Sequence, residues 1–322
     1  MRLPDLLAKP HAPVIEITPL GRPHLEPYLL MLAYPESRRL TATTENFDRP
    51  KIVDWLETRA TTPNRRDWAI VEPAGRFLGE VVLNEFDDAK NSMNLRISLA
   101  GPWAFNLSIG RQAVSLALEH AFDELMLSKV TLEVLSENIR AIRCYESVGF
   151  VPGREFTQKK LRFRRMSVTK EQFVWALAIA GIEKHLPALG WSFALDSAKR
   201  RAGLCNYTDR RISISRHHIE VHKVDETLQV LAHEIGHALT GKSGGHGKKW
   251  LAAAKSIGYR AEKFSGREIA QEKAAWVGAC PQGHEHYRYR KPTRPLSCGL
   301  CDNRFSSRNL IVWKPNVSRD GE

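Results

Sequence analysis

Three histidines and one glutamate stand close together in LAHEIGHALTGKSGGH, the stretch from residue 231 to residue 246. His233 and His237 are four residues apart, so on a helix their imidazoles lie on one face and can share a metal ion. Glu234 follows the first histidine and can reach a water held by that metal. This H-E-x-x-H pattern predicts a zinc site that hydrolyses a bond, with Glu234 taking the proton from the water.

A helix is expected around this motif, with Asp225 as its N-cap and Gly241 as its end. Its apolar residues recur at helical spacing: Leu228, Leu231, Ile235 and Leu239. A catalytic zinc ion usually has three protein ligands and one open position. We expect His246 to be the third ligand, because the glycines around it let the chain turn back towards the helix.

Three further histidines precede the predicted helix: His217, His218 and His222. They fall in or just after a segment that reads as a strand. We expect them to face solvent or DNA and not to bind the metal.

A second set of metal-ligating residues lies near the C-terminus, in CPQGHEHYRYRKPTRPLSCGLC. Cys298 and Cys301 have the C-x-x-C spacing of a zinc knuckle. Cys280 lacks a cysteine partner at that spacing, but His284 follows it within reach and would complete a Cys3His set, with His286 as the alternative. The pattern predicts a closed, structural zinc site that stabilises the fold when loaded.

Basic residues alternate with two tyrosines between these ligands: Tyr287, Arg288, Tyr289, Arg290, Lys291 and Arg294. Cations and aromatic rings in this order suit phosphate contact and base stacking on single-stranded or distorted DNA. Residues 168–322 also carry 25 basic and 15 acidic residues, whereas residues 1–167 carry 23 and 21. We expect DNA as a partner of the C-terminal half; a solvated basic surface is the alternative.

The composition is that of a globular protein. The chain has 322 residues, 43% of them hydrophobic and 26% charged, which suggests about two domains. The longest apolar run, residues 173–182, is too short to span a bilayer, and the N-terminus has no apolar signal region. An odd number of cysteines, five, argues against a disulfide framework. We expect a soluble, intracellular, cytoplasmic protein without a membrane partner.

The N-terminal half alternates strands and helices. We expect strands at 67–83 (two, around a turn), 94–99, 129–135 and from 150, and helices at 110–126 and 138–150. This order predicts a mixed α/β fold. Thr169 and Gln172 fit a capping box at the start of a further helix that runs to about Leu186. That helix would open a second domain, with a boundary near residue 168.

Part of the N-terminal half fits the pattern N-x-x-A-x-x-x-Y-x-x-x-G-F: Asn138, Ala141, Tyr145, Gly149 and Phe150. With LRISLAGP and GRQAVSLALEHAF before it, this pattern resembles the GNAT acetyltransferase superfamily, most of all its RimJ/RimL-like branch, over residues 14–167. The resemblance implies acetyl-CoA as cofactor. It also implies that Asn138 contacts acetyl-CoA and that Tyr145 lies near the thioester sulfur as a general acid.

The loop before the expected 110–126 helix bears on cofactor binding. A helix N-terminus offers free backbone N–H groups and the positive end of a dipole, which suit a pyrophosphate. The loop reads FNLSIG and keeps only Gly110 of the glycines usual in the family. Our candidates for cofactor contact are Ser108, Gly110 and Arg111. Glu85, which follows the predicted strand ending near residue 83, is the candidate base for the acceptor amine.

The C-terminal half also resembles a known family. AGLCNYTDRRISIS (202–215), the HEIGHAL helix and GGHGKKWLAAA look like the SprT-like (Spartan-type) zinc metalloprotease domain. The resemblance implies that His233, His237 and His246 bind zinc, that Glu234 is catalytic, and that the substrates are proteins bound to DNA.

We therefore expect three parts and a fold that is α/β in the first and α+β in the second. They are a GNAT-like domain (14–167), a SprT-like zincin domain (168–275) and a zinc-ribbon-like Cys/His module (276–315). The main hypothesis is a bifunctional enzyme that transfers acetyl groups and cleaves DNA-associated proteins. One alternative is mainly an N-acetyltransferase that a zinc-binding module recruits to DNA. The other is a non-catalytic DNA-binding adaptor.

Overall fold

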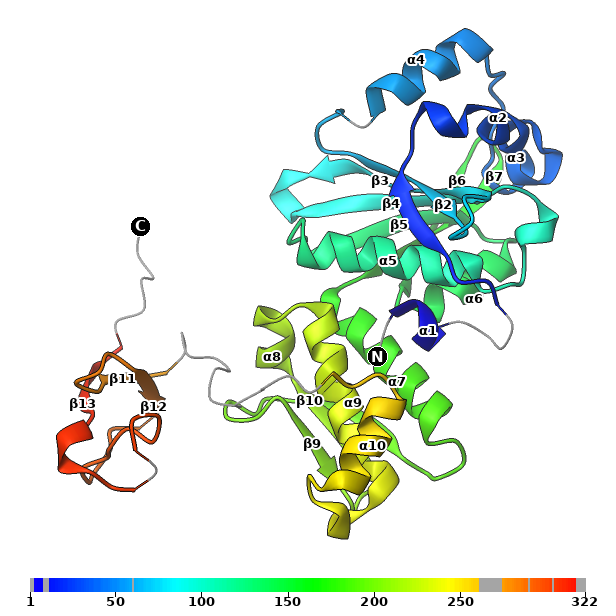
Figure 1. The fold of residues 1–322 in the computed structure, drawn as a ribbon. Helices are drawn as coiled ribbons and strands as arrows, with labels where there is room; N and C mark the ends of the chain where they lie inside the picture. Colours follow the sequence, from blue (N-terminus) through cyan, green and yellow to red (C-terminus); the bar gives the residue numbers. More distant parts are fainter. Residues whose placement is uncertain are drawn as a thin grey trace.

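The computed structural model describes residues 3–7, 12–59, 61–260, 274–288, 290–302 and 304–316 (Figure 1). In the N-terminal half, seven strands form one sheet in the order β1-β2-β3-β4-β5-β7-β6. Their bounds are β1 Glu16–Pro19, β2 Arg66–Val71, β3 Phe77–Asp87, β4 Ser92–Leu99, β5 Lys129–Leu135, β6 Val151–Gln158 and β7 Leu161–Val168. The sheet is antiparallel except for the β4–β5 pair, which is parallel.

Helices cover both faces of this sheet (Figure 1). On one face lie α2 (Leu25–Ala33), α3 (Pro35–Leu40) and α4 (Arg49–Arg59). On the other lie α5 (Ile109–Asp123) and α6 (Ile139–Glu146), together with the short helix α1 (Leu3–Leu7). The predicted mixed α/β fold is confirmed, although α2–α4 were not expected from the sequence.

The second half begins with α7 (Lys170–His185), which the predicted Thr169–Gln172 capping box opens. A three-stranded sheet follows in the order β8-β10-β9, with β8 (Ser192–Asp196) parallel and β9 (Gly203–Asn206) antiparallel to β10 (Arg211–Ser215). Helices α8 (Arg216–Val221), α9 (Val224–Thr240) and α10 (Lys248–Ser256) complete this part. The H-E-x-x-H motif lies on α9 and Gly241 ends that helix, both as the spacing predicted.

The N-terminus of α9 differs from the prediction. Lys223, and not Asp225, is the N-cap residue, and Asp225 lies in the first turn. The helix starts earlier because the Glu226 carboxylate accepts the Lys223 backbone N–H at 2.8 Å, an arrangement typical of a capping box. The expected apolar stripe is also shorter than predicted, since Leu239 is 40% exposed.

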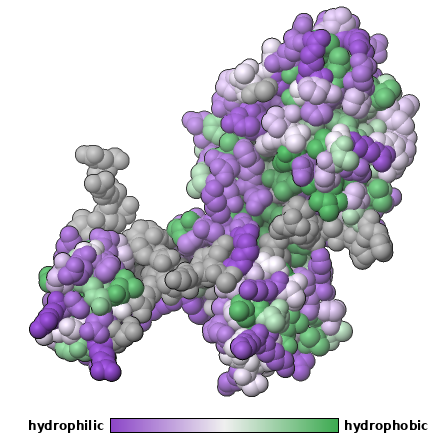
Figure 2. Space-filling model, in the orientation of Figure 1, coloured by the Kyte–Doolittle hydropathy of each residue, from purple (hydrophilic) through white to green (hydrophobic). Residues whose placement is uncertain are grey.

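The described C-terminal part is a small antiparallel sheet in the order β12-β11-β13. Its strands are β11 (Trp276–Ala279), β12 (Glu285–Arg288) and β13 (Val312–Pro315). Hydrophilic residues form most of the surface on the face shown in Figure 2. Within the described residues, none of the helices combines the length and apolar character needed to cross a membrane.

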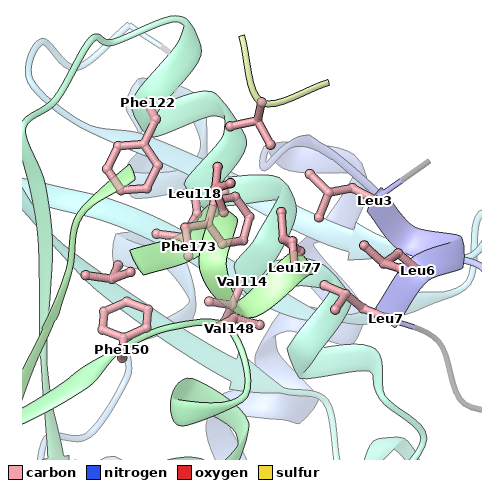
Figure 3. Packing of buried hydrophobic residues seen from close by; sticks show 14 of the residues in the cluster. Leu3, Leu6, Leu7, Val114, Leu118, Phe122, Val148, Phe150, Phe173 and Leu177 are labelled. Atoms are coloured by element: carbon pink, nitrogen blue, oxygen red, sulfur yellow. The ribbon is translucent and has the colours of Figure 1, made fainter. Parts of the chain in front are cut away.

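The first two parts share one hydrophobic core. Figure 3 shows Phe173 and Leu177 of α7 among Val114, Leu118 and Phe122 of α5. The Phe122 and Phe173 rings are 6.1 Å apart, and all five residues are at most 2% exposed. Helix α1 packs at the same place through its leucines. The domain boundary that we propose near residue 168 therefore separates β7 from α7 but does not separate two cores.

A buried carboxylate also joins the two parts. Asp123, the last residue of α5, lies 2.9 Å from the Lys170 ammonium, and its side chain is only 4% exposed. Its second oxygen accepts the backbone N–H of Val224, the first residue of α9, at 2.7 Å. Lys170 in turn donates to the His222 carbonyl at 2.8 Å. The N-terminal half therefore supplies the group that caps the helix with the H-E-x-x-H motif.

We predict that Asp123→Ala lowers the free energy of unfolding by about 3 kcal/mol, because it leaves the Lys170 charge buried without its partner. Urea titration of the full chain measures this change. The control is Glu124→Ala, which breaks an exposed pair with Lys223 and should change the free energy of unfolding much less. Equal losses in the two variants would contradict the structural role of the buried pair.

Candidate functional site

The three histidines of the zinc motif point at one another. The distance between the Nε2 atoms of His233 and His237 is 3.2 Å, and each lies 3.1 Å from the Nε2 of His246. His233 and His237 come from successive turns of α9, and His246 comes from the loop between the short 3₁₀ helix Lys242–Gly244 and α10. The structure thus brings together the three residues that the sequence singles out.

This geometry fits a metal ion. Ligands at about 2.0–2.1 Å from a tetrahedral zinc lie about 3.3 Å apart, close to the observed separations. Burial and the neighbouring imidazoles lower the pKa of His233 to about 4, and burial likewise lowers the pKa of His237. Near pH 7 these rings are neutral, which is the form that binds a metal.

Trp250 on α10 forms the wall of this site and was not among the residues expected from the sequence. Its ring centroid is 4.8 Å from those of His233 and His246 and 5.3 Å from that of His237. The indole is 5% exposed and packs beside Gly236, where a Cβ would come within 3.1 Å of Nε1 and 3.0 Å of the Ala254 Cβ. His246 lies in the loop before α10, so helical spacing from His246 gives no signal for Trp250.

Glu234 is buried against β9, with only 8% of its surface exposed. Burial raises the pKa of Glu234 to about 7, while a hydrogen bond from the Cys205 backbone N–H opposes that rise. A cation bound by the neighbouring histidines would favour the carboxylate form. Glu234 can therefore exchange a proton near neutral pH.

The expectation for the preceding histidines was wrong in part. His217 and His218 lie on helix α8 and not on a strand. His218 is fully buried and its ring stacks on that of His222 at 4.1 Å. Burial lowers the pKa of His218 to about 3, so the ring is neutral. The ring is part of the protein interior and does not face solvent or DNA.

A second cluster of metal-ligating atoms lies in the C-terminal sheet: Cys280, His284, Cys298 and Cys301. The Sγ atoms of Cys280 and Cys301 are 3.7 Å apart, and the His284 Nδ1 lies 3.2–3.6 Å from the three sulfurs. Tetrahedral zinc with bonds of about 2.3 Å to sulfur would place its sulfurs about 3.7 Å apart. His284 belongs to this set, whereas the alternative, His286, contacts the Cys298 Sγ from outside it at 3.2 Å.

The basic residues of this module are exposed: Arg288, Arg290, Lys291 and Arg294. Lys291 lies over the Trp276 ring, with 5.3 Å between the ammonium and the ring centroid. Tyr287 is half-buried and donates its hydroxyl to Glu285, and Tyr289 lies outside the described residues.

A cavity of about 730 Å³ opens in the N-terminal half. It forms because β4 and β5 pair only over three residues, from Ser92–Lys129 to Asn94–Thr131, and then separate. Five predicted cofactor residues line it: Ser108, Gly110, Arg111, Asn138 and Tyr145. Four arginines also line it, Arg96, Arg111, Arg140 and Arg143, with Glu133 as an acidic neighbour. The cavity therefore suits an anionic ligand.

The loop into α5 adopts the conformation that glycine usually supplies. Asn106 and Ser108 both have positive φ, 62° and 60°. Ser108 is the N-cap residue but makes no side-chain cap hydrogen bond. At Gly110 a Cβ would meet Cys144 and Ile97 only at ordinary contact distances, 3.7 and 3.8 Å. Asparagine and serine thus adopt backbone conformations in this loop that glycine adopts more readily.

The predicted acyl-transfer residues differ in their placement. Tyr145 lies in the wall of the cavity, and burial raises the pKa of its hydroxyl. Asn138 also lines the cavity, but its side chain accepts the Ala141 N–H and caps α6. Glu85 is exposed at an irregularity in β3 and lies outside the cavity lining. The strand continues to Asp87, past the end expected near residue 83, and carries Glu85 away from the site.

A different carboxylate, Glu80, lies beside the cavity. It pairs across β3 and β4 with Ser98, a lining residue, and accepts the Tyr28 hydroxyl at 3.1 Å. Burial raises the pKa of Glu80 to about 7, against the opposing charge of Arg96. The signal in the sequence, which was overlooked, is a charged residue in the middle of the apolar strand FLGEVVL.

Comparison with known proteins identifies both halves. The family described as acetyltransferase (GNAT) domain matches residues 15–151, and the SprT-like family matches residues 170–270. The chain thus joins a GNAT acetyltransferase domain to a domain of a metallopeptidase family, which confirms the two resemblances. The RimJ/RimL-like branch and the zinc ribbon stay predictions.

Solved structures similar to this chain include acetyltransferases from Vibrio cholerae. Spermidine N-acetyltransferase in complex with CoA and spermine is 18% identical, with a TM-score of 0.45, over 50% of this chain and 98% of its own. Spermidine/spermine N-acetyltransferase in complex with manganese ions is 18% identical, with a TM-score of 0.42, over 50% and 95%. No curated protein matches the chain.

We predict that Glu80→Gln stabilises the protein at pH 8 but has little effect at pH 4. The folded-state pKa of about 7 lies above the ordinary value of 4.5, so ionisation costs stability progressively as pH rises through this window. Glutamine removes that cost, at most about 3 kcal/mol, and keeps an acceptor for Tyr28. Urea unfolding at the two pH values measures it, and a gain of the same size at both would refute the assignment.

Proposed function

We propose that this chain, which joins a GNAT acetyltransferase domain to a SprT-like domain, is a bifunctional enzyme. Its zinc-dependent protease would cleave DNA-associated proteins. The observation that carries this proposal is the convergence of three Nε2 atoms beside one buried carboxylate. Three histidines with an open fourth position are typical of a catalytic zinc site and not of a closed structural one.

Each residue has a distinct task in this proposal. His233, His237 and His246 would hold the ion, which when bound would polarise the scissile carbonyl and lower the pKa of a water. Glu234 accepts the proton of that water at its carboxylate and later gives a proton to the leaving amine. Trp250 keeps the three imidazole rings in place from behind.

The proposal that DNA is a partner rests on the positive charge of exposed lysines and arginines. Lys242, Lys248 and Lys249 flank His246 and are exposed, so the rim of the proposed protease site is basic. Four exposed cations of the C-terminal module add to it: Arg288, Arg290, Lys291 and Arg294. Phosphate contacts of this kind would make binding fall steeply with salt. The Cys280–His284–Cys298–Cys301 set would hold a second zinc that stabilises the module.

We predict that Glu234→Gln keeps zinc but loses at least about 100-fold in cleavage of a DNA-bound protein, because glutamine does not accept the proton. Metal analysis should give two zinc ions per chain for both the wild type and this variant. A gel assay with a DNA-bound protein, with and without DNA, measures cleavage.

The matched control is His246→Ala, which should reduce the zinc content to one per chain and also abolish cleavage. Cleavage by Glu234→Gln at the wild-type rate would refute the mechanism. If the wild type cleaves nothing but binds DNA as tightly as Glu234→Gln does, the chain is a DNA-binding adaptor instead.

The arginine-lined cavity supports a second activity, acetyl transfer. The free N–H groups at the start of α5, with Ser108, Gly110 and Arg111, would hold the pyrophosphate of acetyl-CoA. The cofactor would supply the activated acetyl group. Tyr145 would protonate the departing thiolate, and Glu80 replaces Glu85 as the carboxylate that could take the proton of the acceptor amine.

We predict that acetyl-CoA binds the full chain and that Arg140→Ala weakens binding about tenfold, since a charge-assisted hydrogen bond to a phosphate is worth about 1.5 kcal/mol. Arg140 lines the cavity and its guanidinium lies 3.7 Å over the Phe105 ring. Isothermal titration calorimetry measures both affinities. Arg162→Ala, on β7 outside the cavity lining, is the control. No measurable binding by the wild type would exclude the acetyltransferase activity.

A further inference from the structure

Gly203 is the first residue of β9 and lies directly against the helix that carries the H-E-x-x-H motif. A Cβ at this position would come within 2.7 Å of the Val230 Cγ1 and within 2.9 Å of both Cγ and Oε1 of Glu234. These distances are well inside van der Waals contact, so any side chain here must displace a neighbour. The backbone conformation of Gly203 is one that other residues can adopt, and the close approach alone therefore requires glycine.

The same strand also binds Glu234. The backbone N–H of Cys205, two residues further along β9, faces the Glu234 carboxylate and opposes the rise of its pKa. Cys205 itself is buried, and the Tyr207 hydroxyl beyond it donates to the His237 carbonyl at 3.4 Å. Strand β9 and the residue that follows it therefore contact both the proposed base and the backbone of the helix that holds it.

We propose that Gly203 and the Cys205 N–H position the Glu234 carboxylate, and that the missing side chain at residue 203 is required for hydrolysis but not for metal binding. This inference rests on the proposed protease function. Gly203 acts through Glu234 and is a positioning residue, because the atoms nearest to a Cβ at residue 203 belong to Val230 and Glu234 and not to the histidines.

A positioning role of Gly203 can be distinguished from a simple packing role because stability and activity depend on different neighbours. A methyl group at residue 203 clashes with Val230 and with Glu234, and the two clashes can be relieved one at a time. Val230→Ala removes the Cγ1 atom and makes room for the methyl in the core. It leaves the clash with the Glu234 Cγ and Oε1, so the carboxylate stays displaced. Stability and activity should therefore respond differently in the double variant.

The experiment compares the full-length wild type with Gly203→Ala and Gly203→Ala/Val230→Ala. We expect Gly203→Ala to lower kcat for cleavage of a DNA-bound protein about 100-fold, since a misplacement of about 1 Å can cost this much. KM and the two zinc ions per chain should not change. The double variant should regain part of the Tm but not the kcat. The control is Gly21→Ala, where a Cβ meets Pro23 only at 3.9 Å and nothing should change.

A double variant with the kcat of the wild type would overturn the inference, as would a Gly203→Ala variant that cleaves normally. A measurement of Tm, which needs no proteolysis, tests this inference independently of the proposed protease function. In the Glu234→Ala background, Gly203→Ala should lower the Tm less than it does in the wild type, because the clash with the carboxylate is gone. Equal Tm losses in both backgrounds would refute the contact even if no protein substrate is ever cleaved.

Discussion

The buried Asp123 carboxylate is the contact on which the relation between the two halves depends. It closes α5, pairs with Lys170 at the start of α7, and caps α9 through the Val224 N–H. A buried charge is tolerated only when it is paired and hydrogen-bonded, so these elements must keep their relative positions. The N-terminal end of α5, where we propose that the cofactor binds, and the helix that carries the H-E-x-x-H motif therefore lie at opposite ends of one rigid helix.

Close approach at glycines maintains the same arrangement. Gly149 has a φ of +95°, and a Cβ there would lie 2.5 Å from the Gln172 carbonyl, so the end of α6 rests directly on α7. Gly236 admits Trp250, and Gly203 admits the Glu234 side chain. At each of these glycines the missing side chain lets two elements approach closely. The proposed zinc site is therefore tightly packed.

The two proposed sites obtain their ligands in different ways. The zinc site uses neighbouring turns of one helix and a loop that folds back, so its donors are close in sequence. The acyl cavity depends on the separation of β4 from β5 and on a loop whose Asn106 and Ser108 take up left-handed conformations. A shared hydrophobic core joins the two halves that carry these sites.

The sequence by itself determined the features that depend on local spacing. The helical repeat placed His233 and His237 together, and the short separation of Cys280 and His284 kept both within reach of one ion. Local capping chemistry likewise predicted the start of α7 at Thr169. These relations need only the geometry of one turn, and the chain order alone is sufficient to state them.

Only the tertiary structure decided the contacts between distant segments. Asp225 was an obvious cap by residue type, but Asp123 from another element reaches the first helical N–H instead. Glu85 followed an expected strand end, yet pairing with β4 extends β3 and leaves Glu80 beside the cavity. His218 is fully buried, and Gly203 is explained by Val230 and Glu234, which follow it by 27 and 31 positions. Packing between elements sets these positions. A local sequence pattern does not show which distant residue will contact a given side chain.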